Sequence, residues 1–589
     1  MSLFSSDQII PRQPFWVPAR PSSARTRSPR KTESIMDKAW KGLLKSGIIF
    51  LTFSLFVYIL YYIDFLEFQR TPMPPFKNIR GSSDPGSNRN FCTLRPLSPE
   101  EIDEENTLLD SIAWPNVPSV PPPVSLNDTS NAALSNFVIL PRPGGGSWLV
   151  GDQLEVLIKM FDFKGHPKNH GGDFLLARLH NRTLEAGVAG QVVDHLNGTY
   201  SAVFLLPWEG KSQVEITLVN PNEAIPFLDQ FVGEKPNGVD FHSTFKSGSL
   251  TQTTICSVCL PPTQQPQCNY TDLNTGELWF CYKPQNLSCN ARINHFVTNH
   301  KPVKAQEDIL FKHGVTMNVG IPASGPAHVT VFPKMKGQLS AKTNKDIPGP
   351  AGYYYKGLWS SLSGSTVKQF NNASAISQCL KDKVVHMYGD STIRQWIEFL
   401  SSKLSGLKLH KKHNLHHCGP YVALDDAKNI FVTFRCHGLP LRMPSLPVTE
   451  LRYIANELDG ITGGNNTVVV IGFWAHLTIF PIKYYIHRIM SIRKAVVRLL
   501  ARAPDTRVII RTANLKQSPH PNPHPIIFSD WPSLQRDKIL RSMFQGMKVY
   551  FVDAWEMTVA HYLKHDLHPP RPIIKNMIDV VLSYICPPK

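Results

Sequence analysis

The chain has 589 residues, of which 42% are hydrophobic, and its 62 Lys and Arg against 45 Asp and Glu give a formal net charge of +17. This length favours more than one domain, and the hydrophobic content is sufficient for packed cores, which excludes a wholly disordered chain. No nucleic-acid-binding motif accompanies the positive charge, so we expect it to attract anionic glycans or a membrane surface instead.

The N-terminal region predicts a membrane anchor. Residues 1–46 are basic and rich in Pro and Ser, which indicates a disordered cytosolic segment. Residues 47–63, GIIFLTFSLFVYILYYI, carry no charge and are long enough to span a bilayer as a helix. Lysines precede this run and acidic residues follow it, so the remainder of the chain should lie in the lumen as a type II membrane protein. The alternative is a cleaved signal peptide, which would give a secreted protein.

After the anchor, residues 64–130 are rich in Pro, Ser and Asn, and we interpret them as a stem. Residues 131–350 contain short alternating runs such as QLEVLIKMF and YSAVFLL, broken by Gly, Asn and Pro. That pattern is typical of an antiparallel, immunoglobulin-like β-sandwich, and it ends in a cysteine-rich segment.

Potential glycosylation sites support the lumenal assignment, because all seven follow the predicted anchor. They are Asn127, Asn181, Asn197, Asn269, Asn286, Asn372 and Asn465.

In a lumenal compartment, cysteines are expected to form disulfides rather than zinc sites. The sequence does not determine their pairing, except that Cys418 and Cys436 flank one loop and can join across it. The expected disulfide pool is Cys256, Cys259, Cys268, Cys281, Cys289, Cys418 and Cys436.

Residues 351–589 alternate apolar strands with helical patterns, beginning with VVHMY and TIRQWIEFLSSKL and ending with IIKNMIDVVLSYI. This alternation predicts a mostly parallel sheet covered by helices on both faces. The fold class is therefore α/β plus all-β. Ligands of such sheets bind beyond the carboxyl ends of the strands.

One polar turn lies at such a strand end. In VVHMYGDSTIRQW, Ser391 begins a helix, where unpaired backbone N–H groups favour a developing oxyanion. A serine nucleophile needs a base, and KHDLHPPRP places His568 in the loop between the last strand and the last helix. The alternative interpretation of Ser391 is a plain helix cap.

These motifs carry a family resemblance. The Gly-Asp-Ser turn with a late His-Pro resembles the PC-esterase branch of the SGNH (GDSL-like) hydrolases, and CNYTDLNTGELWFCYKP resembles neurexophilin. Together they resemble the neurexophilin and PC-esterase domain (NXPE) family. The resemblance implies a three-layer α/β/α domain in which Ser391 is the nucleophile and His568 the base. Asp566 would complete a triad, although the superfamily usually has Asp three residues before the His; Asp553 is the alternative.

The resemblance also implies an oxyanion hole. Its donors would be the backbone of Ser391, Gly438 in FRCHGLP and His476 in GFWAHLTIF, which replaces the usual Gly-x-Asn. Arg394, just after the serine, is a candidate substrate-binding cation. The histidine-rich stretch 410–419 is interpreted as a solvated basic loop, so no metal site is predicted.

Two functions remain open. The first is a lumenal Golgi O-acetyltransferase or acyl esterase that transfers acetyl to sialic acid on glycoproteins, with no bound cofactor and acetyl-CoA as the donor. The second is a catalytically inactive glycoprotein ligand that binds a receptor through its β-sandwich. The irregular position of Asp566 is what keeps the second interpretation open.

Overall fold

The computed structural model describes residues 94–115, 125–234, 239–300, 309–312, 314–334, 349–362, 366–411, 417–516 and 529–587. The predicted cytosolic segment and the anchor at 47–63 lie outside these residues. Of the helices in the described ranges, none is both long and apolar enough to cross a bilayer. The chain divides into two units, Met1–Asn88 and Arg89–Lys589, and all described residues belong to the second.

The C-terminal half is built on a seven-stranded sheet. Five of its strands run parallel, and β18 and β19 extend one edge antiparallel. The strand order is β18 (Lys408–Lys411), β19 (Tyr421–Asp425), β20 (Ile430–Cys436), β17 (Val384–Gly389), β22 (Thr467–Gly472), β23 (Arg507–Arg511) and β24 (Tyr550–Val552).

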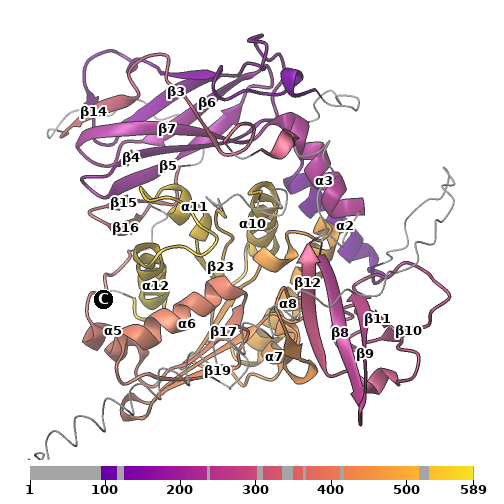
Figure 1. The fold of residues 1–589 in the computed structure, drawn as a ribbon. Helices are drawn as coiled ribbons and strands as arrows, with labels where there is room; N and C mark the ends of the chain where they lie inside the picture. Colours follow the sequence, from indigo (N-terminus) through magenta and orange to yellow (C-terminus); the bar gives the residue numbers. More distant parts are fainter. Residues whose placement is uncertain are drawn as a thin grey trace, which may run out of the picture. The chain divides into compact units, whose positions relative to one another are not determined.

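Helices cover both faces of this sheet, as Figure 1 shows. Strand β22 is buried along its whole length; Val468 and Val470 face one core, and Val469 and Ile471 face the other. The first core is shared with α5 (Ala373–Leu380), α6 (Ser391–Lys403) and α12 (Arg571–Ile585), and the second with α7 (Ile454–Asp459), α8 (Ile482–Arg502) and α10 (Trp531–Phe544). The short α11 (Ala554–Val559) follows β24. The result is a mixed α/β architecture in three layers.

The N-terminal half forms a mostly antiparallel β-module, in which β14 and β2 pair in parallel. Its strands are β1 (Asn136–Ile139), β2 (Trp148–Leu149), β3 (Gln153–Lys159), β4 (Phe174–Asn181), β5 (Ala186–Asp194), β6 (Thr199–Leu205), β7 (Gly210–Asn220), β13 (Val319–Ile321) and β14 (His328–Phe332). One half of β5 pairs with β4 and the other half pairs with β6, so β5 joins two layers. Alternate side chains such as Val156, Ile158, Val188 and Phe204 fill the core between them.

Two parts of the predicted β-domain are arranged differently from our expectation. The hairpin of β15 (Gly352–Tyr355) and β16 (Leu358–Ser361) lies beyond the predicted boundary at 350, yet β15 pairs with β5. The cysteine-rich segment forms its own six-stranded sheet rather than the end of the sandwich. That sheet contains β10 (Gln267–Asn269), β11 (Phe280–Tyr282), β9 (Leu250–Ser257), β8 (Val239–Ser247), β12 (Asn294–His300) and β21 (Leu446–Pro447).

Disulfides tie both halves internally. Cys256 pairs with Cys281 and Cys268 with Cys289 inside the six-stranded sheet, and Cys418 pairs with Cys436 beside β20. Cys259 is also disulfide-bonded. The bond between Cys379 and Cys586 was not anticipated from the sequence; it links α5 to the end of α12 across 207 residues.

The predicted stem contains a docked helix, α2 (Pro99–Ser111), which corrects its description as a spacer. Ser98 and Glu101 form a capping box that starts the helix. Glu105 then bonds His487 at 2.9 Å and Lys483 at 3.0 Å, both on α8. The helix is therefore held against the C-terminal domain.

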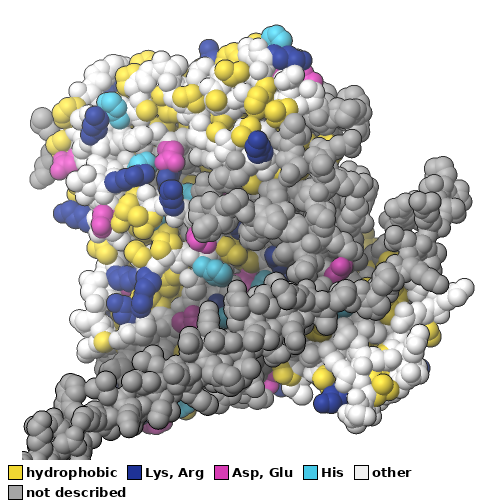
Figure 2. Space-filling view, viewed as in Figure 1, with side chains coloured by type: hydrophobic (Ala, Val, Ile, Leu, Met, Phe, Trp, Pro, Cys, Tyr) yellow, Lys and Arg dark blue, Asp and Glu magenta, His cyan; other side chains and the backbone are white. Residues whose placement is uncertain are grey.

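One face of the described residues carries charged side chains of both signs. On the face drawn in Figure 2, the Lys and Arg side chains of the described residues are interspersed with Asp, Glu and apolar side chains. Such a mixed face differs from the clustered basic stripe that nucleic-acid-binding proteins present.

Candidate active site

Ser391 lies where β17 passes into α6. Gly389 ends the strand, paired with Cys436 of β20 on one side and Gly472 of β22 on the other. A Cβ at Gly389 would stand 1.9 Å from the carbonyl oxygen of Gly472, so only glycine allows this approach of the strands. The serine is thereby fixed at the carboxyl edge of the sheet.

Asp390, the cap of α6, is buried and holds the neighbouring segments together. One carboxylate oxygen accepts from the backbone N–H and the hydroxyl of Thr392, and the other accepts from the N–H groups of Trp474 and Ala475. Burial alone would raise the pKa of Asp390, but nearby His476 and these hydrogen bonds keep it below its usual value. Asp390 is therefore a charged anchor for the loop after β22.

His568 reaches Ser391 from the loop between α11 and α12. Its Nε2 lies 2.7 Å from the serine Oγ, a distance at which the imidazole can accept the hydroxyl proton. Partial burial lowers the pKa of His568. The charges of Asp390 and Asp566 raise this pKa, and those of Arg394 and Arg511 lower it. The net lowering favours the neutral imidazole that a general base requires.

Neither of the two acids considered as third members bonds the ring of His568. Asp566 Oδ1 accepts the backbone N–H of His568 at 3.1 Å, and within the described residues the His568 ring has no hydrogen bond other than that to Ser391. Asp553 caps α11 through the N–H of Glu556 and pairs with Arg541 at 2.6 Å. The structure therefore contains a Ser–His pair, and the alternative of Asp553 as the orienting acid is wrong because its carboxylate is engaged by α10 and α11.

The three predicted oxyanion donors have different environments. The backbone N–H of Ser391 has no acceptor among the described residues, as expected for the first residue of a helix. Gly438 follows Cys436 by two residues at the same sheet edge and has φ of +84°. His476 is bound instead to a second imidazole: its Nδ1 lies 3.0 Å from His437 Nε2, and burial lowers its pKa to about 4. The N–H of Ser391 is thus left for a ligand, whereas the ring of His476 already contacts His437.

Arg394, the candidate substrate cation, projects from α6 one turn after the serine. Its Nη1 donates to the carbonyl oxygen of His417 at 3.1 Å, and its Nε lies 3.6 Å from Glu398. The guanidinium is therefore held in place by its own domain, and its charge acts on His568.

Asn514 was missed in the sequence analysis. It is buried just after β23, and its Nδ2 donates to the carbonyl oxygens of Asp566 at 3.3 Å and Leu567 at 3.2 Å. Its Oδ1 accepts from Arg511 at 2.6 Å. The sequence RVIIRTAN contained a signal for Asn514, since it places a polar residue shortly after an apolar parallel strand. The carboxyl edge of the sheet, where that strand ends, also carries Ser391.

Metal binding finds no support in the described chain. There, no three His, Cys, Asp or Glu are grouped so as to hold a metal ion. Part of the histidine-rich stretch, residues 412–416, lies outside the described residues.

Six of the seven predicted glycosylation asparagines are exposed, and Asn181 is half-buried with its amide bonded to the carbonyl of Lys211.

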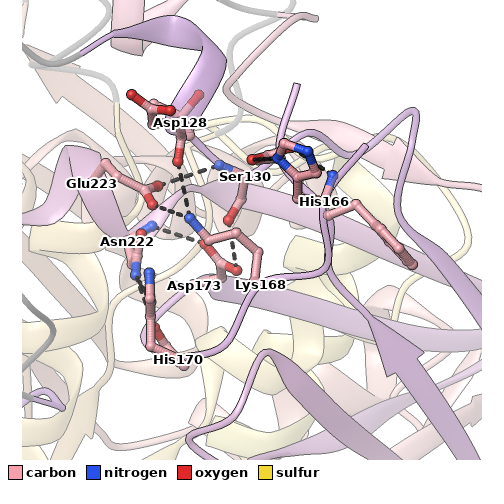
Figure 3. A network of polar contacts seen from close by, with 12 residues as sticks. Asp128, Ser130, His166, Lys168, His170, Asp173, Asn222 and Glu223 are labelled. Carbon is pink, nitrogen blue, oxygen red and sulfur yellow. Dashed lines mark hydrogen bonds and ion pairs between the residues drawn. The ribbon is translucent and has the colours of Figure 1, made fainter. Parts of the chain in front are cut away.

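A second polar cluster lies in the sandwich (Figure 3). Asp173 accepts from Ser130 Oγ at 3.0 Å and from the N–H of Asn222 at 2.9 Å, and Lys168 pairs with Glu223. Burial, together with the neighbouring charge of Glu223, raises the pKa of Asp173 to about 7. Because Asp173 accepts hydrogen bonds from both segments, we assign the cluster a structural role that ties the start of the sandwich to the turn after β7.

Comparisons with known proteins divide the chain in the same way. Residues 105–313 match the family model described as neurexophilin, and residues 359–586 match the model described as NXPE family member 4-like, C-terminal domain. Among solved structures, an active-site mutant of a family two carbohydrate esterase from Clostridium thermocellum aligns with 76% of this chain and 97% of its own at 9% identity. The TM-score of this alignment is 0.19. With a neurexophilin domain followed by the NXPE C-terminal domain, the chain belongs to the NXPE family.

Proposed function

We propose that this protein transfers acyl groups through Ser391, as an O-acetyltransferase or acyl esterase acting on glycans. The observation that carries the proposal is the 2.7 Å contact between His568 Nε2 and Ser391 Oγ at the carboxyl edge of a parallel sheet. A base within hydrogen-bond reach is what makes a serine hydroxyl nucleophilic. We further propose sialic acid on glycoproteins as acceptor, acetyl-CoA as donor, and a type II, Golgi-lumenal location.

The proposed reaction has two half-reactions. Ser391 Oγ attacks the acetyl carbonyl as its proton passes to His568 Nε2, and the oxyanion is held by the N–H groups of Ser391 and Gly438. The C–S bond of the donor then breaks, and the thiol leaves with the proton from His568. In the second half-reaction a sugar hydroxyl loses its proton to His568 and attacks the acetyl-serine carbonyl. The bond between Ser391 Oγ and the acetyl carbon then breaks, and His568 returns the proton to Oγ, which forms the sugar ester and restores Ser391.

The test measures acetyl transfer in the full-length protein. We expect radiolabel from acetyl-CoA to appear on Ser391 by peptide mass analysis, and then on sialylated glycoprotein. Ser391→Ala and His568→Ala should each reduce transfer by about 10³-fold or more. Ser401→Ala, in the same helix, and His410→Ala, an exposed imidazole on β18, are matched controls that should retain activity. Wild-type-like transfer by Ser391→Ala would falsify the proposal.

One observation favours the second candidate, a non-catalytic ligand that acts through its sandwich. Within the described residues no carboxylate bonds the His568 ring, and loss of that orienting acid weakens a Ser–His site. This candidate predicts that wild-type protein acetylates neither Ser391 nor a glycan, and that the sandwich binds a cell-surface receptor.

A further inference from the structure

An arginine of the sandwich holds the loop that carries His568. Arg178 lies on β4, and its Nη1 donates to the carbonyl oxygen of His561 at 2.7 Å and to that of Leu563 at 3.1 Å. The residue is 8% exposed. Two charge-assisted hydrogen bonds therefore reach the loop from a different domain, ending five residues before the candidate base.

The guanidinium is itself oriented by Glu215. This residue lies opposite Arg178 on β7 and accepts from its Nε at 2.9 Å and its Nη2 at 2.8 Å. Burial opposes ionisation of Glu215, but His180 and Arg178 lower its pKa to about 2, so it stays charged at lumenal pH. Because the fork of Arg178 is fixed on one side, Nη1 points at the loop carbonyls.

Other residues of the sandwich pack against the same loop. The ring of Tyr354 on β15 meets the ring of His561 edge-on at 4.6 Å. A Cβ at Gly187 of β5 would lie 2.0 Å from the carbonyl oxygen of Ala560, so the strand runs directly against the start of the loop. At the loop's other end, Asn514 of the C-terminal domain holds the carbonyls of Asp566 and Leu567.

We infer that Arg178, held by Glu215, is a positioning residue for His568, and that the sandwich is a working part of the active site rather than a separable binding module. We call Arg178 and Glu215 the clamp. The inference rests on the proposed role of Ser391 and His568. The clamp fixes the start of the segment 561–567, and Asn514 fixes its end. His568 is the next residue in the chain, so its backbone position is set by both contacts. Displacement of a base by about 1 Å costs on the order of 100-fold in rate.

The experiment compares Arg178→Met, Arg178→Lys and Glu215→Gln in the full-length protein. The matched control is Arg142→Met, which removes a sandwich arginine that pairs with buried Asp152 at 2.8 Å and bonds the carbonyl of Gly145. We expect Arg178→Met to lower kcat for Ser391 acetylation by about 10- to 100-fold with KM within about twofold. Arg178→Lys should recover part of that loss, and Arg142→Met should behave as wild type.

Hydrogen–deuterium exchange supplies a readout that does not depend on activity. Peptides covering 561–567 should exchange faster in Arg178→Met than in Arg142→Met. Unchanged kcat and unchanged exchange in Arg178→Met would overturn the inference. If wild type itself transfers no acetyl, the proposed function fails, and the exchange arm still decides whether the clamp holds the loop. Should Arg178→Met not fold, the milder Glu215→Gln and Arg178→Lys decide by the same two measurements.

Discussion

The carboxylate of Asp566 accepts a hydrogen bond from the backbone N–H of His568 at 3.1 Å, whereas the imidazole of His568 contacts Ser391. In a Ser–His–Asp triad the acid bonds Nδ1 and fixes the tautomer. Here Asp566 shapes the loop through the backbone and acts on the ring through its charge, which raises the pKa of His568. The structure therefore contains a Ser–His pair, and the surrounding charges act on the pKa of His568.

That tuning predicts a pH profile. His568 must be neutral to take the serine proton, so activity falls as pH drops through its pKa, which burial places below the usual 6.5. Asp566→Asn removes a charge that raises this pKa, so the acidic midpoint of kcat/KM should move to lower pH. Arg394→Gln removes a charge that lowers it, so the midpoint should move to higher pH.

The measurement is the kcat/KM of acetyl transfer between pH 4.5 and about 8 in buffers of constant ionic strength, since salt screens exposed charges. Lys408→Gln, on exposed β18, is the charge control and should leave the midpoint in place. Midpoints that move in the same direction in Asp566→Asn and Arg394→Gln would contradict the electrostatic account.

Asn514 provides a second prediction. Asn514→Ala removes the donor that holds the carbonyls of Asp566 and Leu567, and it leaves the guanidinium of Arg511 without the Oδ1 acceptor. Each buried group left unsatisfied costs about 1–3 kcal/mol, so the protein should lose stability. It should also lose acetylation of Ser391 by about tenfold or more, because the end of the His568 loop is freed.

A matched variant separates the two losses. Asn576 is equally buried, on α12, where its Nδ2 donates to the carbonyl of Gly357 and its Oδ1 accepts from the N–H of Trp359. Asn576→Ala should lower the unfolding temperature by a similar amount and leave the acetylation rate of the folded protein near wild type. Equal loss of rate in both variants would show that Asn514 acts only through global stability.

The sequence predicts the parts of the site that follow from strand direction. Ser391 and His568 both come after parallel strands, so the rule that carboxyl ends share one edge brings them together without knowledge of side-chain torsions. The direction of the Asp566 carboxylate depends on loop torsions that no periodicity encodes. Likewise, Asn514 acquires its role only when residues 52 positions later fold against it.

The remaining differences have separate physical causes. The pairing of β15 with β5 was not anticipated, because it is a long-range contact. The same hairpin places Tyr354 and Trp359 in the core of the C-terminal domain. The helix α2 was missed for another reason. Its capping box at Ser98 and Glu101 is a local signal of a helix start, but the proline-rich sequence on both sides led us to interpret the whole region as a stem. The pair Cys379–Cys586 lies too far apart in sequence for spacing to suggest it.

The disulfides give a last prediction. Cys379–Cys586 closes the longer loop, whereas Cys418–Cys436 lies closer to the candidate site, so the two should affect stability and activity in opposite order. Closing a loop of 18 residues, as Cys418–Cys436 does, stabilises by about 3 kcal/mol in the chain-entropy treatment, and closing one of 207, as Cys379–Cys586 does, by about 5 kcal/mol. Replacing both members of the longer pair by Ala should therefore cost more free energy of unfolding in denaturant titrations.

Activity should follow the opposite order. Cys436 pairs with Gly389 in the sheet and stands two residues before Gly438, so opening its disulfide loosens a candidate oxyanion donor. Cys379 and Cys586 join α5 to the far end of α12, away from His568. Measured at a temperature where both variants are folded, the Cys418→Ala, Cys436→Ala protein should acetylate Ser391 more slowly than the Cys379→Ala, Cys586→Ala protein. If rates instead track the free energies of unfolding, the segment after β20 has no part in the chemistry, and the oxyanion role proposed for Gly438 is wrong.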